Sequence, residues 1–222
     1  HAMSKHLDLN NVDFIFSGRD RHEFFDMECF GNWQCLSGLS FAFRNGKVDN
    51  FATLKKNRWW QFYRDVKKVQ KQLHHYDVVI SDFEPVTAWA AKLAGKTCIG
   101  IGHQYAFDHK VPKAGNSFLS RSIMRHFAPV TLGLGLHWHH FGQTILPPIV
   151  EINTAKGDLE NIRIPSKQKN ILVYLGFENR AEIIRLLAPF KDVNFWVYGS
   201  SSSPHDPANV QFKAPSRDGF HQ

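Results

Sequence analysis

The hydrophobic pattern of residues 76–107 predicts a strand, a turn, a helix and a second strand. A short β-branched run at 78–80 predicts a strand that is buried on both faces. Apolar residues recur at helical spacing over 86–93, and Gly95 ends this predicted helix. Residues 97–101 predict the next strand. The order strand–helix–strand implies a parallel sheet, because parallel neighbours need a crossover connection.

Polar residues follow both of these strands. Asp82 and Glu84 come after the first strand, and His103 and Gln104 come after the second. Ligands of open α/β sheets bind beyond the carboxyl ends of the strands. These residues are therefore the first candidates for a functional site.

The two acidic residues have more than one interpretation. Either Asp82 or Glu84 can act as a general base or bind a sugar hydroxyl. Pro85 suits the first position of a helix, and Ser81 or Asp82 is expected to cap the exposed N–H groups there. Capping and catalysis by Asp82 do not exclude each other.

His103 follows a glycine-containing strand end, Gly100-Ile101-Gly102. The glycines allow the backbone to turn sharply or to approach a ligand closely. A histidine at this position can deprotonate a hydroxyl near neutral pH or donate to a phosphate. The alternative is a histidine that is hydrogen-bonded within the turn.

The pattern predicts further elements on both sides of this unit. Asn45-Gly46 predicts a tight turn between short strands, and Asn153 begins a polar stretch typical of a linker. The expected helices are 1–9 (the end of a helix), 51–73, 118–127 and 181–187, and the expected strands are 12–16, 39–43, 130–134, 171–175, 193–198 and 210–212.

The segment 51–73 is the longest predicted helix. Its apolar stripe consists of Trp59, Phe62, Tyr63, Val66, Val69 and Leu73, and its other face is rich in lysine and arginine. A basic amphipathic helix can lie on anionic lipid. The alternative is a helix that packs on the core and exposes its basic face to water.

Composition and charge narrow the possible partners. The net charge is +7, the pI is about 9.4 and 43% of the residues are hydrophobic. The charge fits nucleic acid, an anionic membrane, a phosphorylated small molecule, or solubility alone. Three cysteines are typical of a reduced, cytoplasmic protein, and neither a membrane span nor a signal peptide is recognisable.

Two further patterns bear on ligands. His137, His139 and His140 suggest a metal site, but no Asp, Glu or Cys close in sequence completes a ligand set, so surface or packing roles are favoured. The turn Gly176-Phe177-Glu178-Asn179 precedes the predicted helix 181–187, and backbone N–H groups at a helix start attract phosphate.

Three long motifs carry a resemblance to a known family. They are V-I-S-D-F-E-P-V-T-A-W-A-A, I-G-I-G-H-Q-Y-A-F and L-G-L-H-W-H-H-F-G-Q-T-I-L-P-P-I-V. The chain resembles prokaryotic GT-B glycosyltransferases of the UDP-N-acetylglucosamine:lipopolysaccharide N-acetylglucosamine transferase-like family. This family is distantly similar to the peptidoglycan N-acetylglucosaminyltransferase. F-I-F-S-G-R and I-L-V-Y-L-G-F-E-N also fit the family.

The resemblance implies an α/β fold of GT-B type, with two Rossmann-like domains. We expect an acceptor-side domain at 1–152 that lacks its first strand, a linker at 153–169, and the beginning of a donor-side domain at 170–222. The family's first glycine-rich loop and most of its second domain are not in this sequence. The resemblance therefore implies that these 222 residues alone are inactive.

The resemblance also implies a reaction. A hexosamine, expected to be GlcNAc, would move from a UDP-sugar to a lipid-linked or cell-envelope glycan without a metal or other cofactor. The catalytic residues would be His103, Asp82 and Glu84, with Gly102 and Gln104 near the acceptor and Gly176, Phe177, Glu178 and Asn179 near the donor phosphates. The protein would be cytoplasmic, or peripheral on the inner membrane through 51–73. A non-catalytic nucleotide-sugar or glycan binding protein is the alternative, and nucleic acid is not expected as a partner.

Overall fold

The computed structural model describes most of the chain in two units. The described residues are 3–24, 27–44, 47–113, 122–123, 125–150, 169–175, 178–199 and 201–214. The first unit comprises 1–40 and 55–152, and the second comprises 41–54 and 153–222. Most of the expected linker 153–169 lies outside the described residues.

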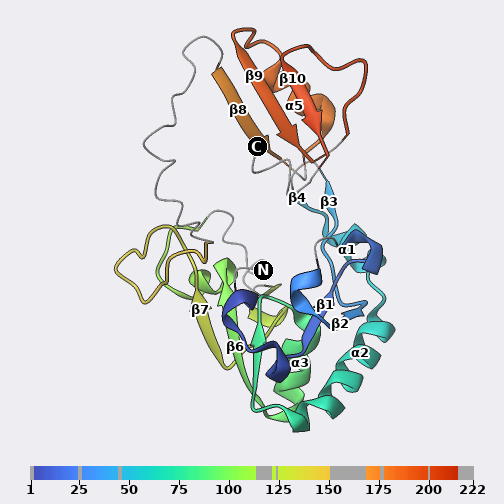
Figure 1. Ribbon diagram of the computed structural model, residues 1–222, viewed down its shortest axis with the longest axis vertical. Helices are drawn as coiled ribbons and strands as arrows, with labels where there is room; N and C mark the ends of the chain where they lie inside the picture. The colour runs from blue at the N-terminus through green and yellow to red at the C-terminus, as the bar shows by residue number, and fades with distance from the viewer. Residues whose placement is uncertain are drawn as a thin grey trace. The chain divides into compact units, whose positions relative to one another are not determined.

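The first unit contains two parallel sheets and two packed helices (Figure 1). One sheet pairs β1 with β2, and the other has the order β5-β6-β7. Helix α2 packs against α3, and both contribute to one apolar core. The elements are β1 (Phe14–Ser17), β2 (Trp33–Leu36), α2 (Trp59–Gln72), β5 (Val78–Ser81), α3 (Pro85–Ala94), β6 (Thr97–Gly102) and β7 (Leu132–Gly135). The structure confirms the predicted α/β class and the parallel pairing of the central unit.

Helix α3 begins as predicted but with a different cap. Pro85 is its first residue, and the side chain of Glu84 accepts hydrogen bonds from the backbone N–H groups of Val86 and Thr87. The prediction of Ser81 or Asp82 as the cap is wrong, because Ser81 bonds the backbone of Glu84 instead. The helix ends at Gly95, whose φ of +64° is the left-handed conformation that glycine adopts without strain.

Strand β5 is buried on one face only, so the prediction of burial on both faces is wrong. Val79 and Ser81 are buried, whereas Val78 and Ile80 are almost half exposed. The reason is that α2 and α3 pack on the Val79 face, where they form the core together with Cys98 of β6. Val78 and Ile80 point to the opposite face, where their side chains stay partly exposed.

The predicted helix 51–73 is two helices, α1 (Asn50–Lys56) and α2. Asn57 lies at the break, where its side chain bonds both the N–H and the carbonyl of Ser40. The inner stripe of α2 also differs from the prediction: Trp59 and Tyr63 are 48% and 50% exposed, and Asp65 is buried. Asp65 is tolerated inside because its carboxylate accepts the N–H of Ser37 and a proton of Gln61.

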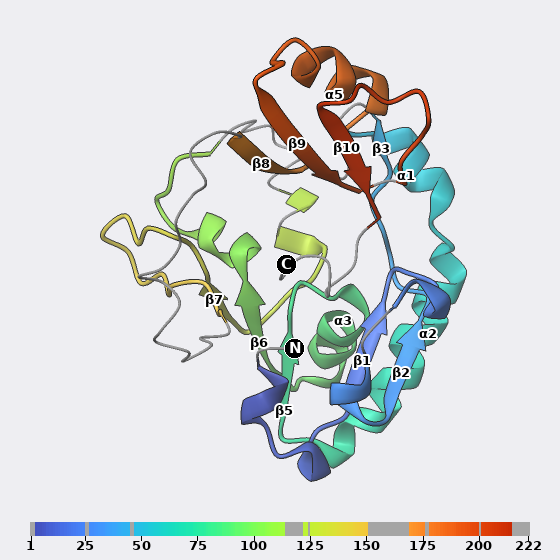
Figure 2. The same ribbon diagram turned by 45° about the horizontal axis from the view of Figure 1, so that its top comes forward.

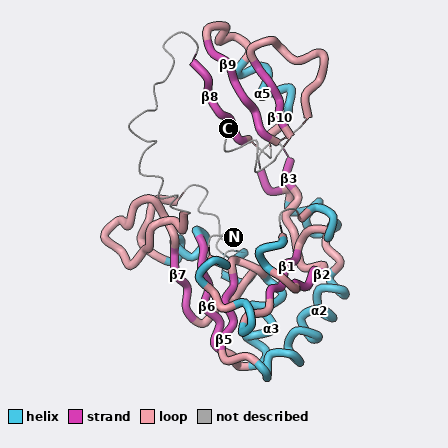
Figure 3. Tube along the Cα trace, in the orientation of Figure 1, coloured by secondary structure: helices cyan, strands magenta, loops and turns pink. Residues whose placement is uncertain are grey.

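Several other elements of the first half of the chain differ from the prediction. Residues 4–6 and 9–11 are short 3₁₀ turns rather than the end of a helix, and the strand predicted at 39–43 is absent apart from the hairpin β3 (Phe43–Arg44) and β4 (Lys47–Val48). A strand at β2 was not predicted. Figure 3 shows these strands and the loop after β7. The helix predicted at 118–127 lies largely outside the described residues.

The second unit confirms the predicted alternation of strands and a helix. Its parallel sheet has the order β10-β9-β8, formed by β8 (Lys169–Tyr174), β9 (Val193–Tyr198) and β10 (Val210–Lys213). Helix α5 (Arg180–Leu187) packs Ile183 and Leu187 against Phe195 and other residues of this sheet. The unit therefore has its own apolar core.

Candidate functional site

The carboxyl ends of β5, β6 and β7 bring the predicted residues to one edge of a sheet (Figure 2). The three strands are parallel neighbours, and Asp82, His103 and His137 follow them in that order. The register pairs Ser81 with Gly100 and Gly102 with Gly135, so the strands end nearly level with one another. This edge is where open α/β sheets place their ligands.

The carboxylate of Glu84 is occupied by donors from its own unit. Its oxygens accept the N–H groups of Val86 and Thr87 at 2.8 and 2.7 Å and the hydroxyl of Thr87 at 2.6 Å. The hydroxyl of Ser17 at the end of β1 also donates to it. Glu84 thus joins the start of α3 to the end of β1, which leaves Asp82 as the acidic residue of this turn without such a role.

Asp82 lies against the end of β6. A methyl group at Gly102 would come within 2.9 Å of Oδ1 of Asp82 and within 3.1 Å of Oε1 of Gln104. The absence of a side chain at Gly102 therefore lets both polar groups approach this strand end. Although Asp82 is exposed at the surface, partial burial of its carboxylate raises its pKa.

His103 turns toward β7. Its Nδ1 lies 3.1 Å from the carbonyl oxygen of Leu136, the first residue after that strand. A carbonyl oxygen can only accept, so Nδ1 carries the proton and, in the neutral ring, Nε2 has the lone pair. The side chain is exposed. This arrangement fixes an imidazole whose outer nitrogen can accept a proton.

Tyr105 forms the packed floor beneath this edge. A methyl group at Gly100 would lie 2.3 Å from its ring, and one at Gly133 would lie 3.2 Å from it. The two glycines therefore let the ring lie flat across β6 and β7. Burial raises the pKa of Tyr105 to about 12. Its hydroxyl lies beside Ser81, but no hydrogen bond of good geometry reaches it.

The loop after β7 holds a group of aromatic rings. The ring of His137 stacks on that of His103, with centroids 5.2 Å apart and planes at 25°. Phe107 meets His103 edge-on, and Phe141 packs against His137. Phe141 has a φ of +52°, a conformation that bulky residues rarely adopt. Strained residues of this kind are enriched at functional sites.

The predicted donor-side residues belong to the second unit. Gly176 and Phe177 lie outside the described residues. Asn179 caps α5 by accepting the N–H of Ala181 at 2.8 Å, and Glu178 is exposed just before it. Arg180, the first residue of α5, is bound to Asp206 at 2.5 Å and lies 3.7 Å from the ring of Phe212.

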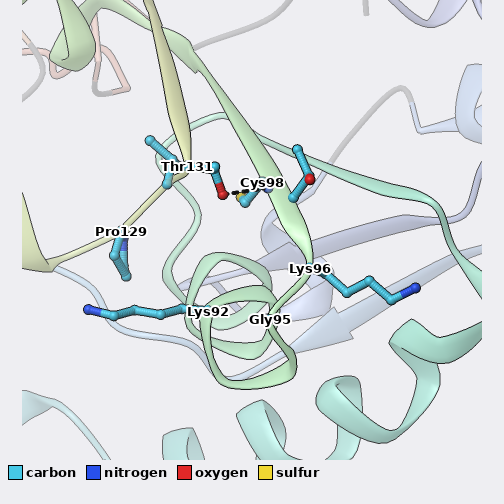
Figure 4. A pocket seen from close by; sticks show the side chains of 8 residues that line it. Lys92, Gly95, Lys96, Cys98, Pro129 and Thr131 are labelled. Carbon is cyan, nitrogen blue, oxygen red and sulfur yellow. Dashed lines mark hydrogen bonds between the residues drawn. The ribbon is translucent and has the colours of Figure 1, made fainter.

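A pocket of about 330 Å³ lies at the opposite end of β6. Figure 4 shows its lining, which comes from the end of α3, the start of β6 and residues 129–131. Lys92 lies over the ring of Trp89, and Lys96 donates to the carbonyl of Tyr76. The polar groups of the candidate site do not line this pocket, so the pocket has no part in the predicted chemistry.

The described residues offer neither a cluster of metal ligands nor a helix that could span a membrane. No group of three or more His, Cys, Asp or Glu side chains in the described ranges is arranged to hold a metal ion. This finding covers His137, His139 and His140, which do not form such a group. None of the described helices combines the length and the apolar character needed to cross a bilayer.

Comparison with known protein families identifies the chain. The model of glycosyl transferase family 1 matches residues 3–222. The chain belongs to this family. Neither the comparison with curated proteins nor that with solved structures returned a match. Membership of glycosyl transferase family 1 supports transfer of a sugar from a nucleotide-sugar donor to a glycan acceptor, on the GT-B type of α/β fold.

Two further polar residues lie at this edge of the sheet, and the sequence pattern did not predict a site role for either. Ser17 is the last residue of β1 and donates to Glu84, and His137 lies two residues after β7 and stacks on His103. Both could have been found by the rule that selected His103, because each is a polar residue just after a predicted strand. The sequence pattern groups His137 with His139 and His140 and favours surface or packing roles for all three over a metal site.

Proposed function

We propose that the protein transfers a hexosamine, GlcNAc, from UDP-GlcNAc to a lipid-linked or cell-envelope glycan, such as lipopolysaccharide of a prokaryote. Family membership supports the class of reaction. The observation that carries the proposal is the exposed imidazole of His103, with Nδ1 held by the carbonyl of Leu136 and Nε2 directed outward as a proton acceptor. The acceptor hydroxyl would bind at this edge of the first unit.

In the proposed reaction His103 is the general base. Nε2 removes the proton of the acceptor hydroxyl as its oxygen attacks the anomeric carbon of the donor sugar. The bond between that carbon and the phosphate oxygen breaks, and UDP leaves with the electron pair. Asp82 and Gln104, on either side of Gly102, would bind other groups of the acceptor. Asp82 is the alternative base, and Glu84 holds the turn in place.

The donor phosphates would bind the second unit without a metal ion. Backbone N–H groups at the start of α5 can stabilise a developing negative charge. The N–H of Ala181 is already used by Asn179. The N–H of Glu178 likewise donates to the carbonyl of Leu175 at 3.3 Å. The proposal therefore assigns the donor phosphates to the approach to α5 as a whole and not to one of these N–H groups.

UDP release from UDP-GlcNAc by the full-length protein tests the proposal. His103→Ala should lower kcat at least tenfold, the scale of general-base loss, while KM for UDP-GlcNAc stays unchanged. His126→Ala is a matched control, because His126 also bonds a carbonyl through Nδ1, and its own carbonyl accepts a hydrogen bond from Trp89 of α3. Equal turnover of wild type and His103→Ala would remove His103 from the mechanism. Calorimetric binding of UDP-GlcNAc without any UDP release would favour a binding protein instead.

We also propose that the first unit contacts anionic lipid at the inner membrane through α2, the part of the basic segment 51–73 that forms a long helix in this unit. Trp60 is 71% exposed and stacks on Tyr63, whose ring lies 5.9 Å from Nζ of Lys67. Lys68 and Lys71 are exposed further along α2. Exposed aromatic rings beside lysines suit the boundary between lipid head groups and acyl chains.

Sedimentation with vesicles of phosphatidylglycerol and phosphatidylcholine tests this contact. The double variant Trp60→Ala/Lys67→Ala should bind phosphatidylglycerol vesicles less well, whereas Lys191→Ala, an exposed lysine of the second unit, should not. Equal binding of wild type to vesicles with and without phosphatidylglycerol would refute the contact. Salt-sensitive binding to RNA at low salt, without vesicle binding, would assign the basic face to nucleic acid.

A further inference from the structure

His137 has a backbone partner that fixes its tautomer. The peptide N–H of His139 points at Nδ1 of His137 from 3.1 Å. A peptide N–H always carries its proton, so Nδ1 must supply the lone pair. The carbonyl oxygen of His139 lies at the same distance, but a proton on Nδ1 would meet the N–H hydrogen. In the neutral ring the proton of His137 therefore sits on Nε2.

The two stacked imidazoles are thus held in opposite tautomers. His103 donates from Nδ1 to Leu136 and leaves Nε2 as an acceptor, whereas His137 accepts at Nδ1 and leaves Nε2–H as a donor. Their ring centroids are 5.2 Å apart. An acceptor and a donor side by side match a sugar that carries two neighbouring hydroxyl groups, because one gives its proton and the other supplies a lone pair.

The loop that carries His137 is tied down at both ends. The N–H of His137 donates to the carbonyl of Leu146 at 2.9 Å, and the N–H of Leu146 donates to Gly135 at 2.9 Å. Inside the loop, the strained Phe141 packs its ring against both His137 and His139, with centroids 5.2 and 4.7 Å away. The backbone hydrogen bonds at the ends of the loop and the packing of Phe141 together hold the ring of His137 in place.

We infer that His137 is an acceptor-binding residue, whose Nε2–H donates a hydrogen bond to a second hydroxyl oxygen of the acceptor sugar. The inference rests on the proposed role of His103 as the base for the first hydroxyl. It names the acceptor chemistry that this edge selects: a glycan with a hydroxyl beside the reacting one. The competing explanation is that His137 only stabilises its own turn through Nδ1.

Amide substitutions separate these two roles. Asn places an acceptor where the Nδ1 of His137 lies and keeps the hydrogen bond from the N–H of His139, but it has no donor at the position of Nε2. Gln places a donor near the position of Nε2 instead. With UDP-GlcNAc as donor and octyl β-N-acetylglucosaminide as acceptor, H137N should raise KM for the acceptor about three- to tenfold, the loss of one neutral hydrogen bond. H137Q should recover most of this loss, and KM for UDP-GlcNAc should not change.

His140→Asn is the matched control, because His140 makes the same kind of turn bond by accepting the N–H of Gly142 at 3.0 Å. It should leave both KM values unchanged. An H137N enzyme with wild-type acceptor KM, or an H140N enzyme with the same loss as H137N, would assign His137 to the turn and overturn the inference.

Nitrogen NMR of the imidazoles tests the inference without turnover. At pH 8 His103 should show the Nδ1–H tautomer and His137 the Nε2–H tautomer. Addition of octyl β-N-acetylglucosaminide should shift the Nε2 signal of His137 and leave that of His140 unchanged. The same tautomer in both rings, or no shift of His137, would overturn the inference. If UDP-GlcNAc is not turned over but the shift occurs, the proposed donor fails and the acceptor site stands.

Discussion

The Glu84→Ala variant tests the reasoning about the cap of α3. Glu84 accepts two backbone N–H groups of the first turn and the hydroxyls of Thr87 and Ser17. Loss of an N-cap side chain costs about 1 kcal/mol. The link to Ser17 adds about 1 kcal/mol, the usual net value of a hydrogen bond. The free energy of unfolding should therefore fall by about 2 kcal/mol, and Ser17→Ala alone should account for about half of it.

Urea unfolding and hydrogen exchange measure this effect. The amides of Val86 and Thr87 should exchange faster in Glu84→Ala, because they lose their acceptor. Glu182→Ala is the control: Glu182 is also in the first turn of a helix, but its exposed pair with Arg185 at 2.6 Å is expected to contribute less than about 1 kcal/mol. A loss in Glu84→Ala no larger than that in Glu182→Ala would refute the reasoning.

Three further predictions concern the same unit. Partial burial raises the pKa of Asp82, so the native state holds this proton to higher pH than the unfolded chain does. The free energy of unfolding therefore falls as pH rises through the interval between the two pKa values. In urea titrations Asp82→Asn should be more stable than wild type at pH 7, but not at pH 3. Tyr105→Phe should not destabilise the protein, because no hydrogen bond to its hydroxyl is lost. Gly100→Ala should cost about 1–3 kcal/mol, because the added methyl group overlaps the ring of Tyr105. A lower melting temperature for Tyr105→Phe than for Gly100→Ala would contradict this packing. Burial raises the pKa of Cys98 to about 11 and also raises that of Cys35, but Cys35 is partly exposed whereas Cys98 is buried. A disulfide reagent at pH 8 should therefore label Cys35 before Cys98, and equal rates would show that Cys98 is accessible.

The sequence predicted the central unit well because its signals are local. Proline at the first helical position, Gly95 at the end of α3 and the β-branched run of β5 each act through their own backbone neighbours. The order of strand, helix and strand then required parallel pairing. The placing of Asp82 and His103 at one sheet edge followed from this order, and their catalytic roles remain predictions.

Other features depended on contacts between segments far apart in the chain. Glu84 became the cap partly because Ser17, 67 residues earlier, donates to it. Asp65 is buried where its carboxylate accepts the backbone N–H of Ser37. The break before α2 coincides with the hydrogen bonds between Asn57 and Ser40. The periodicity of a single helix does not contain these partners. The helical pattern of 51–73 therefore placed Trp59 and Tyr63 in the apolar stripe and did not include Asp65 in it.

The sequence by itself determined the class of fold and the identity of the polar residues at the strand ends, because alternation, helical spacing and turn residues act over a few positions. The tertiary structure decided how those residues are used. It turned His103 toward the carbonyl of Leu136 and His137 toward the N–H of His139, and so assigned a proton to each ring. A tautomer is set by the partner that a ring nitrogen meets, and for His103 that partner is brought by a neighbouring strand.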